Sequence, residues 1–226
     1  MTLVRLVRAF ALALVSLGIA QAGLITSSSQ IGQPQTVINF SQFAGANAIT
    51  TMGPVAVASG VTFRSTNPDG STLGQGPYSF NDNGTWNSSV TFAGLNVDQF
   101  GGDRYTMTFS FAHPVSAVGG LLNYAVFQYS GFSDVVMNAL AANGSVLETY
   151  DISAIAPIST PNAVNGSEFR GIEDSRADIF GFSLSNSAVA LTDLTFSSTI
   201  PEPSTWCLLL AGLCGLLLSG RPRRRQ

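Results

Sequence analysis

The segment "YTMTFSF" at Tyr105–Phe111 decides the fold class, because large apolar residues alternate with small hydroxyl-bearing residues along its whole length. Successive side chains of an extended chain point to opposite faces, so this alternation separates an apolar face from a polar one. The apolar face consists of Tyr105, Met107, Phe109 and Phe111. The segment is therefore predicted to be a β-strand with one buried face.

Short segments of the same kind recur on both sides of this strand, and helical spacing is nearly absent. The further predicted strands are Thr36–Phe40, Val55–Phe63, Ser88–Ala93, Ala117–Tyr129, Asp134–Ala141, Ser145–Tyr150, Asp178–Leu184 and Val189–Phe196. About nine short strands with glycine- and proline-rich connections predict an all-β domain, an antiparallel β-sandwich of jelly-roll type.

Two glycine-containing pairs predict local backbone features. Asn143-Gly144 joins two predicted strands, and it supplies the positive φ that a tight hairpin requires. Gly119-Gly120 lies inside a predicted strand, where glycine indicates a β-bulge or a close approach of two backbones.

The N-terminal end has the pattern of an export signal. Two arginines within the first eight residues precede an apolar stretch at 9–20. Ala20 and Ala22 then form a small-x-small cleavage site, which leaves Gly23 as the first residue of the mature chain. We therefore expect residues 1–22 to form a signal helix that directs the chain to the Sec export machinery. Signal peptidase then removes this helix.

The C-terminal end combines a proline motif, an apolar run and a basic tail. The apolar run Trp206–Leu218 has thirteen residues, fewer than the roughly 20 that cross a bilayer, so with its neighbours it predicts a marginal transmembrane helix over 206–220. The basic tail, residues 221–226, contains Arg221, Arg223, Arg224 and Arg225. Such a cluster favours a cytoplasmic position for the C-terminus, which places residues 23–200 on the exterior side of the membrane. The alternative is a buried core helix.

These C-terminal features resemble the sorting signal of bacterial PEP-CTERM proteins, over 201–226. The motif itself is Pro201, Glu202, Pro203, Ser204 and Thr205. The resemblance implies recognition by an exosortase, a membrane-embedded cysteine transpeptidase that cuts at or near the motif and then releases or re-attaches the protein. It also implies that the catalytic residues belong to that enzyme. The two prolines keep the segment extended, as a protease cleft requires, although they can also simply separate domain from anchor.

The domain also looks like exported PEP-CTERM sandwich domains. The similarity rests on "GVTF" at 60–63, "FAHPVSAVGG" at 111–120, "ANGSVLETY" at 142–150 and "ALTDLTF" at 190–196. Similar patterns occur in lectin-like and carbohydrate-binding sandwiches. The resemblance therefore implies an exported β-domain and raises glycan binding as a possible role.

Charge and cysteine usage limit the function classes. Residues 23–200 contain four arginines, no lysine and twelve acids, which gives a formal charge of −8. Nucleic-acid binding requires clustered basic side chains, so it is not expected. Both cysteines, Cys207 and Cys214, lie in the C-terminal apolar run, so the exported domain has no disulfide.

Candidate catalytic residues are few. His113 is the single histidine of the chain, and no G-x-S-x-G, H-E-x-x-H or P-loop motif accompanies it, so we interpret it as a turn residue. Glycosidases use paired carboxylates, for which Glu173-Asp174 or Asp98 with Asp103 are the candidates. We expect the protein not to be an enzyme.

Calcium is a possible cofactor, because it prefers oxygen ligands. Asp69 and Asp82 lie in loops rich in Asn and Gly. Jelly-roll modules often hold a structural calcium near their first and last strands, where this sequence has Asn39 and Asp193. The alternative is that these polar residues only form Asx-turns between strands.

Three aromatic residues lie together in the polar segment "GQGPYSFNDNGTWNSS". Tyr78, Phe80 and Trp86 can stack on sugar rings if they are exposed, while neighbouring amides bind the hydroxyls. The alternative is that they plug one end of the sandwich.

The predicted function is thus a surface or matrix protein of a biofilm, associated with exopolysaccharide, with a carbohydrate- or calcium-dependent binding module as the alternative.

Overall fold

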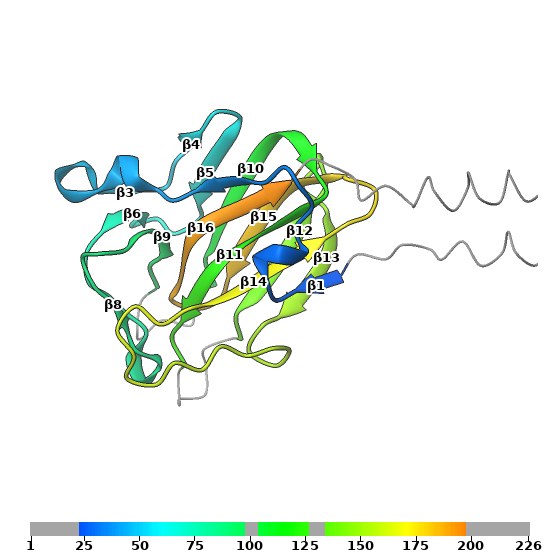
Figure 1. Ribbon diagram of the computed structural model, residues 1–226. Helices are drawn as coiled ribbons and strands as arrows, with labels where there is room; N and C mark the ends of the chain where they lie inside the picture. The colour runs from blue at the N-terminus through cyan, green and yellow to red at the C-terminus, as the bar shows by residue number, and fades with distance from the viewer. Residues whose placement is uncertain (1–22, 98–103, 127–133, 198–226) are drawn as a thin grey trace, which may run out of the picture.

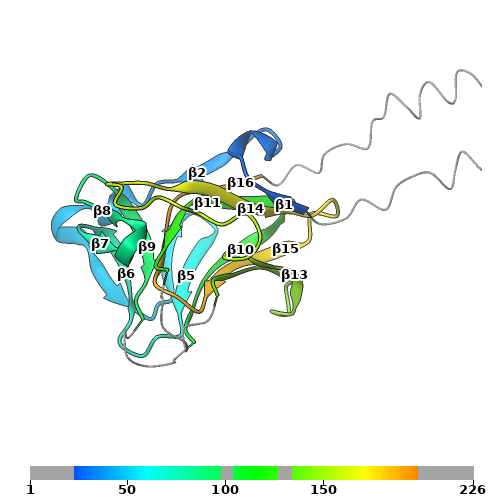
Figure 2. The ribbon, with the colours of Figure 1, turned by 90° about the horizontal axis from the view of Figure 1, so that it is seen from below.

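The computed structural model describes residues 23–97, 104–126 and 134–197, and these form an all-β structure. Figures 1 and 2 show two large sheets that face each other, with a small third sheet at one end. All ladders within the three sheets are antiparallel. The predicted all-β class and antiparallel pairing are therefore confirmed.

The first sheet has eight strands in the order β1-β14-β11-β16-β9-β6-β3, and β2 pairs with β16 beyond the end of β9. The bounds are β1 Gly23–Ile25, β2 Thr36–Ile38, β3 Ile49–Thr51, β6 Ser71–Gln75, β9 Thr91–Leu95, β11 Ala117–Tyr124, β14 Glu168–Glu173 and β16 Val189–Ser197.

The second sheet has six strands in the order β13-β12-β15-β10-β5-β4. The bounds are β4 Val55–Ala58, β5 Val61–Ser65, β10 Thr106–Val115, β12 Val136–Leu140, β13 Val146–Asp151 and β15 Ile179–Ser185. A small hairpin pairs β7 Tyr78–Ser79 with β8 Thr85–Trp86. Four short 3-10 turns are η1 Ser28–Gln30, η2 Ser41–Phe43, η3 Gly45–Asn47 and η4 Asn81–Asn83.

Strand β10 contributes to the core as its alternation predicts. Met107 and Phe109 are fully buried in a core that both sheets share, and Phe111 is 6 % exposed. The Phe109 ring packs against Phe63 from β5 at 5.6 Å and against Phe40 at 5.9 Å between centroids. The core is therefore closed by aromatic contacts between segments far apart in sequence.

Most predicted strands are present with shifted ends. The predicted strand Val55–Phe63 is two strands, because Gly60 has φ +73° and turns the chain back between β4 and β5. Strand β11 ends at Tyr124, earlier than predicted, and residues 127–133 lie outside the described ranges. The prediction missed β1, β3, β6, β14 and the β7–β8 hairpin, whose short or polar sequences do not alternate clearly.

The hairpin and glycine predictions are confirmed. The connection between β12 and β13 contains Gly144 at φ +81°. A Cβ on Gly119 would lie 2.5 Å from the Arg170 carbonyl oxygen, so this position requires glycine for close packing against β14. The ladder between β11 and β16 shifts register next to this pair, opposite Asp193, as in a β-bulge.

The outer face of the eight-stranded sheet carries two separate apolar clusters. The first, the η1 cluster, consists of Ile25, Ile31, Ala117, Leu121 and Phe169. The second, the hairpin cluster, consists of Tyr78, Phe80, Trp86, Val90, Phe92 and Ala190. Each cluster is covered by a short element laid over the sheet, so part of the sheet face lies between them.

Both ends of the described domain lie at one end of the sandwich. Gly23 in β1 is paired with Glu173 in β14, Glu173 with Ala117 in β11, and Ala117 with Ser197 in β16. The four residues thus form one row across neighbouring strands, and three strand spacings separate Gly23 from Ser197 by roughly 14 Å. Figures 1 and 2 show β1 and the end of β16 on the same side in both views.

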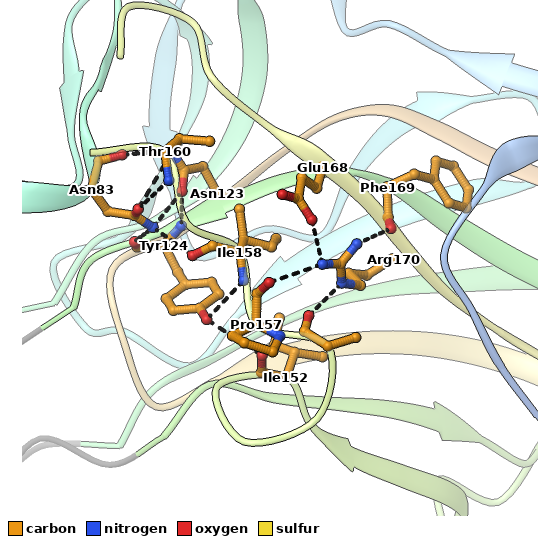
Figure 3. A network of polar contacts seen from close by, with 11 residues as sticks. Asn83, Asn123, Tyr124, Ile152, Pro157, Ile158, Thr160, Glu168, Phe169 and Arg170 are labelled. Carbon is orange, nitrogen blue, oxygen red and sulfur yellow. Dashed lines mark hydrogen bonds and ion pairs between the residues drawn. The ribbon is translucent and has the colours of Figure 1, made fainter. Parts of the chain in front are cut away.

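A long loop, residues 152–167, connects β13 to β14 and is fixed by a buried amide network (Figure 3). The Asn83 side chain is 4 % exposed, and its Oδ1 accepts a hydrogen bond from the Thr160 backbone N–H at 2.7 Å. Its Nδ2 donates to Asn123 Oδ1 at 2.9 Å and to the carbonyls of Tyr124 and Ile158 at 3.0 and 3.1 Å. This amide therefore ties the long loop to β11.

Arg170 fixes the same loop from the other side. Its side chain is 6 % exposed. Its guanidinium donates to the Ala156 carbonyl at 2.6 Å and to the Pro157 carbonyl at 3.1 Å, both in the long loop (Figure 3). It also forms an ion pair with Glu168 at 2.5 Å. A loop of this length without regular structure is uncommon unless it serves a function, and here its backbone is held in place.

Within the described residues, no helix has the length and apolar character needed to span a bilayer. The predicted signal helix over 1–22 and the predicted transmembrane helix over 206–220 lie outside those ranges.

Candidate functional site

A polar depression, here called the central hollow, opens on the outer face of the eight-stranded sheet between the η1 and hairpin clusters. Its volume is about 310 Å³, at the lower end of the range of small-molecule sites. It is lined by Asn39, Trp86, Ser89, Val90, Thr91, Leu121, Asn165, Ser167, Thr192 and Asp193. These residues come from β8, β9 and the connection between them, from β11, β16 and the long loop, and from the residue after β2, so the hollow exists only in the folded sheet.

Asp193 is placed in the hollow by the bulge of β16. The ladder pairs Gly119 with Thr195 but Leu121 with Thr192, so β16 has an extra residue at this point. Asp193 has φ +50°, a left-handed conformation that Asp adopts more readily than most residues but that still costs energy. As a result, the consecutive residues Thr192 and Asp193 both line the hollow, which a regular strand does not allow.

The Asp193 carboxylate lies in a partly desolvated position. Burial raises the pKa of Asp193 above its usual value, and no other cause contributes. Among the described residues, the ion pairs join Arg170 with Glu168 and Arg176 with Asp174 and Asp178, and none of them reaches Asp193. A carboxylate in this position gains from any ligand that donates hydrogen bonds to it.

The walls of the hollow are held by hydrogen bonds of their own. Asn165 Nδ2 donates to Asn87 Oδ1 at 3.2 Å and to Ser89 Oγ at 3.1 Å, and Asn165 Oδ1 accepts from the Asn87 backbone N–H at 2.9 Å. On the opposite side, the Asn39 carbonyl accepts a hydrogen bond from Thr91 Oγ1 at 2.5 Å. The shape of the hollow is therefore preformed.

The structure corrects the prediction that Tyr78, Phe80 and Trp86 form an exposed stacking platform. Phe80 and Trp86 are 0 % and 1 % exposed, and the three rings pack on one another in the hairpin cluster. The Tyr78 hydroxyl donates to the Leu95 carbonyl at 2.6 Å, and Trp86 Nε1 donates to the Gly166 carbonyl at 2.8 Å. The rings are buried, as the alternative interpretation requires, but they cover the outer face of the eight-stranded sheet instead of plugging the end of the sandwich.

The calcium candidates are separated in the fold. Asp193 and Asn39 line the same hollow, as their predicted positions near the last and first strands suggested. Asp69 lies exposed in a turn where Asn67 Oδ1 accepts its backbone N–H at 2.9 Å, as the Asx-turn alternative predicted. Asp82 is exposed in η4. Within residues 23–97, 104–126 and 134–197, no three His, Cys, Asp or Glu side chains gather as a metal site requires.

The catalytic candidates also lie apart from the hollow. His113 lies exposed within β10, which continues to Val115, so the prediction of a turn residue is wrong. Glu173 ends β14, and Asp174 is buried against Arg176, whose guanidinium Nη2 lies 3.3 Å from Asp174 Oδ2.

Asp174 is held in its charged form. Its burial opposes ionisation, but hydrogen bonds from the Arg176 backbone and guanidinium outweigh burial and lower the pKa of Asp174. The neighbouring Asp178 has the opposite shift, because burial and a hydrogen bond with Asp174 raise its pKa. The other predicted carboxylate pair, Asp98 with Asp103, lies outside the described residues.

The sorting residues fall mostly outside the described ranges. These are Ala20, Ala22, the motif Pro201, Glu202, Pro203, Ser204 and Thr205, and the basic residues Arg221, Arg223, Arg224 and Arg225. Gly23, the predicted new N-terminus, is the first residue of β1. The predicted cleavage point therefore coincides with the first residue of the described fold.

Comparison with known proteins bears on this C-terminal part. A family model described as the PEP-CTERM protein-sorting motif matches residues 199–225. No curated protein matches the sequence of the chain. The motif implies recognition by an exosortase and sorting of an exported protein to the cell surface or beyond. The chain thus carries a PEP-CTERM sorting motif behind an all-β domain.

Proposed function

We propose that this chain is a non-enzymatic component of the bacterial cell surface or extracellular matrix, associated with exopolysaccharide in a biofilm. Its signal peptide, residues 1–22, is removed on export. Its C-terminal segment, 206–220, anchors it in the inner membrane until an exosortase cuts at the motif 201–205. The matched sorting motif at 199–225 is the observation that supports this proposal.

The position of the domain ends supports a transient double attachment. Gly23 and Ser197 lie in one row of the sheet, roughly 14 Å apart across three strand spacings. Three residues separate Ser197 from Pro201. Both processing sites therefore belong to the same end of the domain, so a folded domain presents both to a membrane at once.

We infer further that the domain is a jelly roll. Strands β9 to β16 support this inference, because they form two four-stranded arrays in the orders β9-β16-β11-β14 and β10-β15-β12-β13. Such crossing between two sheets produces the paired Greek keys of the jelly roll. Strands β1, β3, β4, β5 and β6 extend the two sheets at their edges, and β2 pairs with β16 beyond the end of β9.

A non-enzymatic role agrees with the arrangement of the carboxylates. Asp174, the buried member of the predicted Glu173-Asp174 pair, is engaged by Arg176. The central hollow contains one carboxylate, whereas glycoside hydrolysis uses two facing each other. We therefore expect no turnover of polysaccharide.

The test is mass spectrometry of the chain recovered from bacterial cells with and without exosortase. With the enzyme, the recovered chain begins at Gly23 and lacks the arginines at 221–225, whereas without it the C-terminal arginines remain. The variant Pro201→Ala with Pro203→Ala keeps its C-terminus in both strains, and Pro157→Ala, in the long loop, serves as the processed control. Retention of the arginines in unmodified chains from the exosortase strain contradicts the proposal.

A further inference from the structure

We propose that the central hollow binds one sugar residue of a neutral polysaccharide, with the Asp193 carboxylate as the principal acceptor for its hydroxyl groups. This inference rests on the proposed function in one respect, because exopolysaccharide is the material that surrounds a protein sorted to the cell surface. The site itself is formed by the geometry of the sheet.

The Asp193 carboxylate calls for a ligand that donates hydrogen bonds. It lines a concave site, and among the described residues no ion pair compensates its charge. Hydrogen bonds to an ionised group are roughly twice as strong as neutral ones. Two neighbouring hydroxyl groups of a sugar can each donate a hydrogen bond to one of the two carboxylate oxygens. An arginine guanidinium pairs with a carboxylate in the same way, but a sugar does so without a positive charge.

The other lining residues fit a ring with polar edges and apolar faces. Ser167 and Thr192, which carry hydroxyl groups, line the same hollow as Asp193, and a hydroxyl both donates and accepts hydrogen bonds. The apolar residues Leu121, Val90 and Trp86 also line the hollow. Sugars need both kinds of contact, since their hydroxyls radiate from a ring whose C–H groups are apolar.

Other ligand classes fit less well. An anionic ligand is repelled by the Asp193 carboxylate and by the formal charge of −8 over residues 23–200. Calcium takes six to eight oxygen ligands, mostly with several carboxylates, and the lining contains one. A large apolar ligand leaves the polar lining residues without partners, which costs binding free energy.

Three features indicate that the hollow is built rather than incidental. The β16 bulge holds Asp193 in a strained left-handed conformation, and strained residues cluster at binding sites. One wall is formed by the long loop, which Asn83 and Arg170 fix to the sandwich. That wall is further joined to the β8–β9 connection through the side chain of Asn165. A preformed site loses little entropy on binding.

The experiment is isothermal titration calorimetry with the full chain solubilised in detergent. The probes are cellohexaose, maltohexaose, mannohexaose and exopolysaccharide extracted from the producing cells, with a galacturonate oligomer and calcium chloride as charged comparisons. We expect the full chain to bind at least one neutral probe at one site, and neither charged comparison to bind.

The diagnostic variant is Asp193→Asn, because Asn also tolerates the left-handed conformation and keeps the size of the side chain. We expect it to weaken binding at least tenfold without lowering the Tm. The matched control, Asp69→Asn in an exposed turn, binds within twofold of the unmodified chain. A second variant, Ser167→Trp, fills the hollow and abolishes binding, so the test does not depend on one substitution.

Each contrary result is decisive. Absence of binding to all neutral probes, equal affinities of the Asp193→Asn and Asp69→Asn variants, or calcium binding that Asp193→Asn removes would each overturn the sugar site. None of these results affects the processing of the C-terminus in cells. Failure of the hollow and failure of the sorting proposal are therefore distinguishable.

Discussion

Two polar regions of this domain, the amide network around Asn83 and the central hollow around Asp193, differ in how completely their polar atoms are satisfied. Asn83 is 4 % exposed, and both its side-chain oxygen and its side-chain nitrogen have protein partners. Asp193 is only partly buried, and its carboxylate faces a hollow of about 310 Å³. The polar side-chain atoms of Asn83 are therefore satisfied within the protein, whereas the Asp193 carboxylate can still accept further hydrogen bonds.

This difference separates a structural role from a binding role. Buried polar groups that are fully hydrogen-bonded make a fold rigid and specific, and removing one leaves its partners unsatisfied. A part-buried charge without a compensating partner destabilises the free protein, so its presence points to a ligand. Substitutions in the two regions are therefore expected to have opposite consequences.

The largest loss of stability is expected for Asn83→Ala. The substitution removes one hydrogen-bond partner each from Asn123 Oδ1, the Thr160 N–H and two backbone carbonyls, so we expect the free energy of unfolding to fall by about 3–5 kcal/mol. Chemical denaturation of the full chain measures it. The control Asn47→Ala, at an exposed position, changes stability by no more than about 0.5 kcal/mol. Similar losses for both variants would mean that the network does not stabilise the domain.

A somewhat smaller loss is expected for Arg170→Leu. The guanidinium holds two carbonyls of the long loop, so we expect a loss of about 2–4 kcal/mol and faster hydrogen exchange over residues 152–167. Exchange followed by mass spectrometry locates the effect. Exposed Arg64→Leu is the matched control and leaves this loop protected. Unchanged protection of the loop in the Arg170 variant would contradict its assigned role.

A loss of about 1–2 kcal/mol at neutral pH is expected for Asp174→Asn, because the hydrogen bonds from Arg176 favour the charged carboxylate. The lowered pKa of Asp174 means that the folded state binds this proton less readily than the unfolded chain. Its contribution is therefore present above the ordinary pKa of 3.8 and is lost as the pH falls through the folded pKa. Thermal unfolding from pH 7 to pH 2 should show the deficit disappear.

The smallest effect, and of opposite sign, is expected for Asp193→Asn. The raised pKa of Asp193 means that the folded state binds this proton more readily, so stability falls as the pH rises through the interval above 3.8. Removing the charge leaves the Tm unchanged or slightly higher at pH 7, and the difference vanishes well below pH 3.8. A clear fall in Tm at pH 7 would give Asp193 a structural role and erase the contrast with Asn83.

The sequence predicts the sheets better than the site, for a physical reason. Alternation in β10 is a local property, and it identifies the buried face of Met107 and Phe109 correctly. The Gly119-Gly120 pair likewise indicated the bulge, which turns out to lie opposite Asp193. Strands such as β14, with its central Arg and Gly, lack such a local pattern and were missed.

The lining of the hollow depends on contacts that sequence patterns do not encode. Asn39 and Asp193 were paired through the expected neighbourhood of the first and last strands, and they do line one hollow. The opposite wall comes from Asn165, whose side chain bonds to residues 76 and 78 positions earlier. The sequence left two interpretations of the aromatic segment open, because its polar neighbours suggest exposure, whereas the fold buries its rings in the hairpin cluster.

The order of the strands also sets when the domain matures. Strand β16 comes last in the chain yet lies inside its sheet, between β11 on one side and β9 with β2 on the other. The sheet cannot close until the last residue of β16, Ser197, is available to pair with Ala117, and Pro201 follows four residues later. The sheet is therefore completed only by the residues that directly precede the sorting motif matched at 199–225. A chain that ends before β16 leaves β11 without a neighbour on one side and removes the strand that joins β11 to β9 and β2.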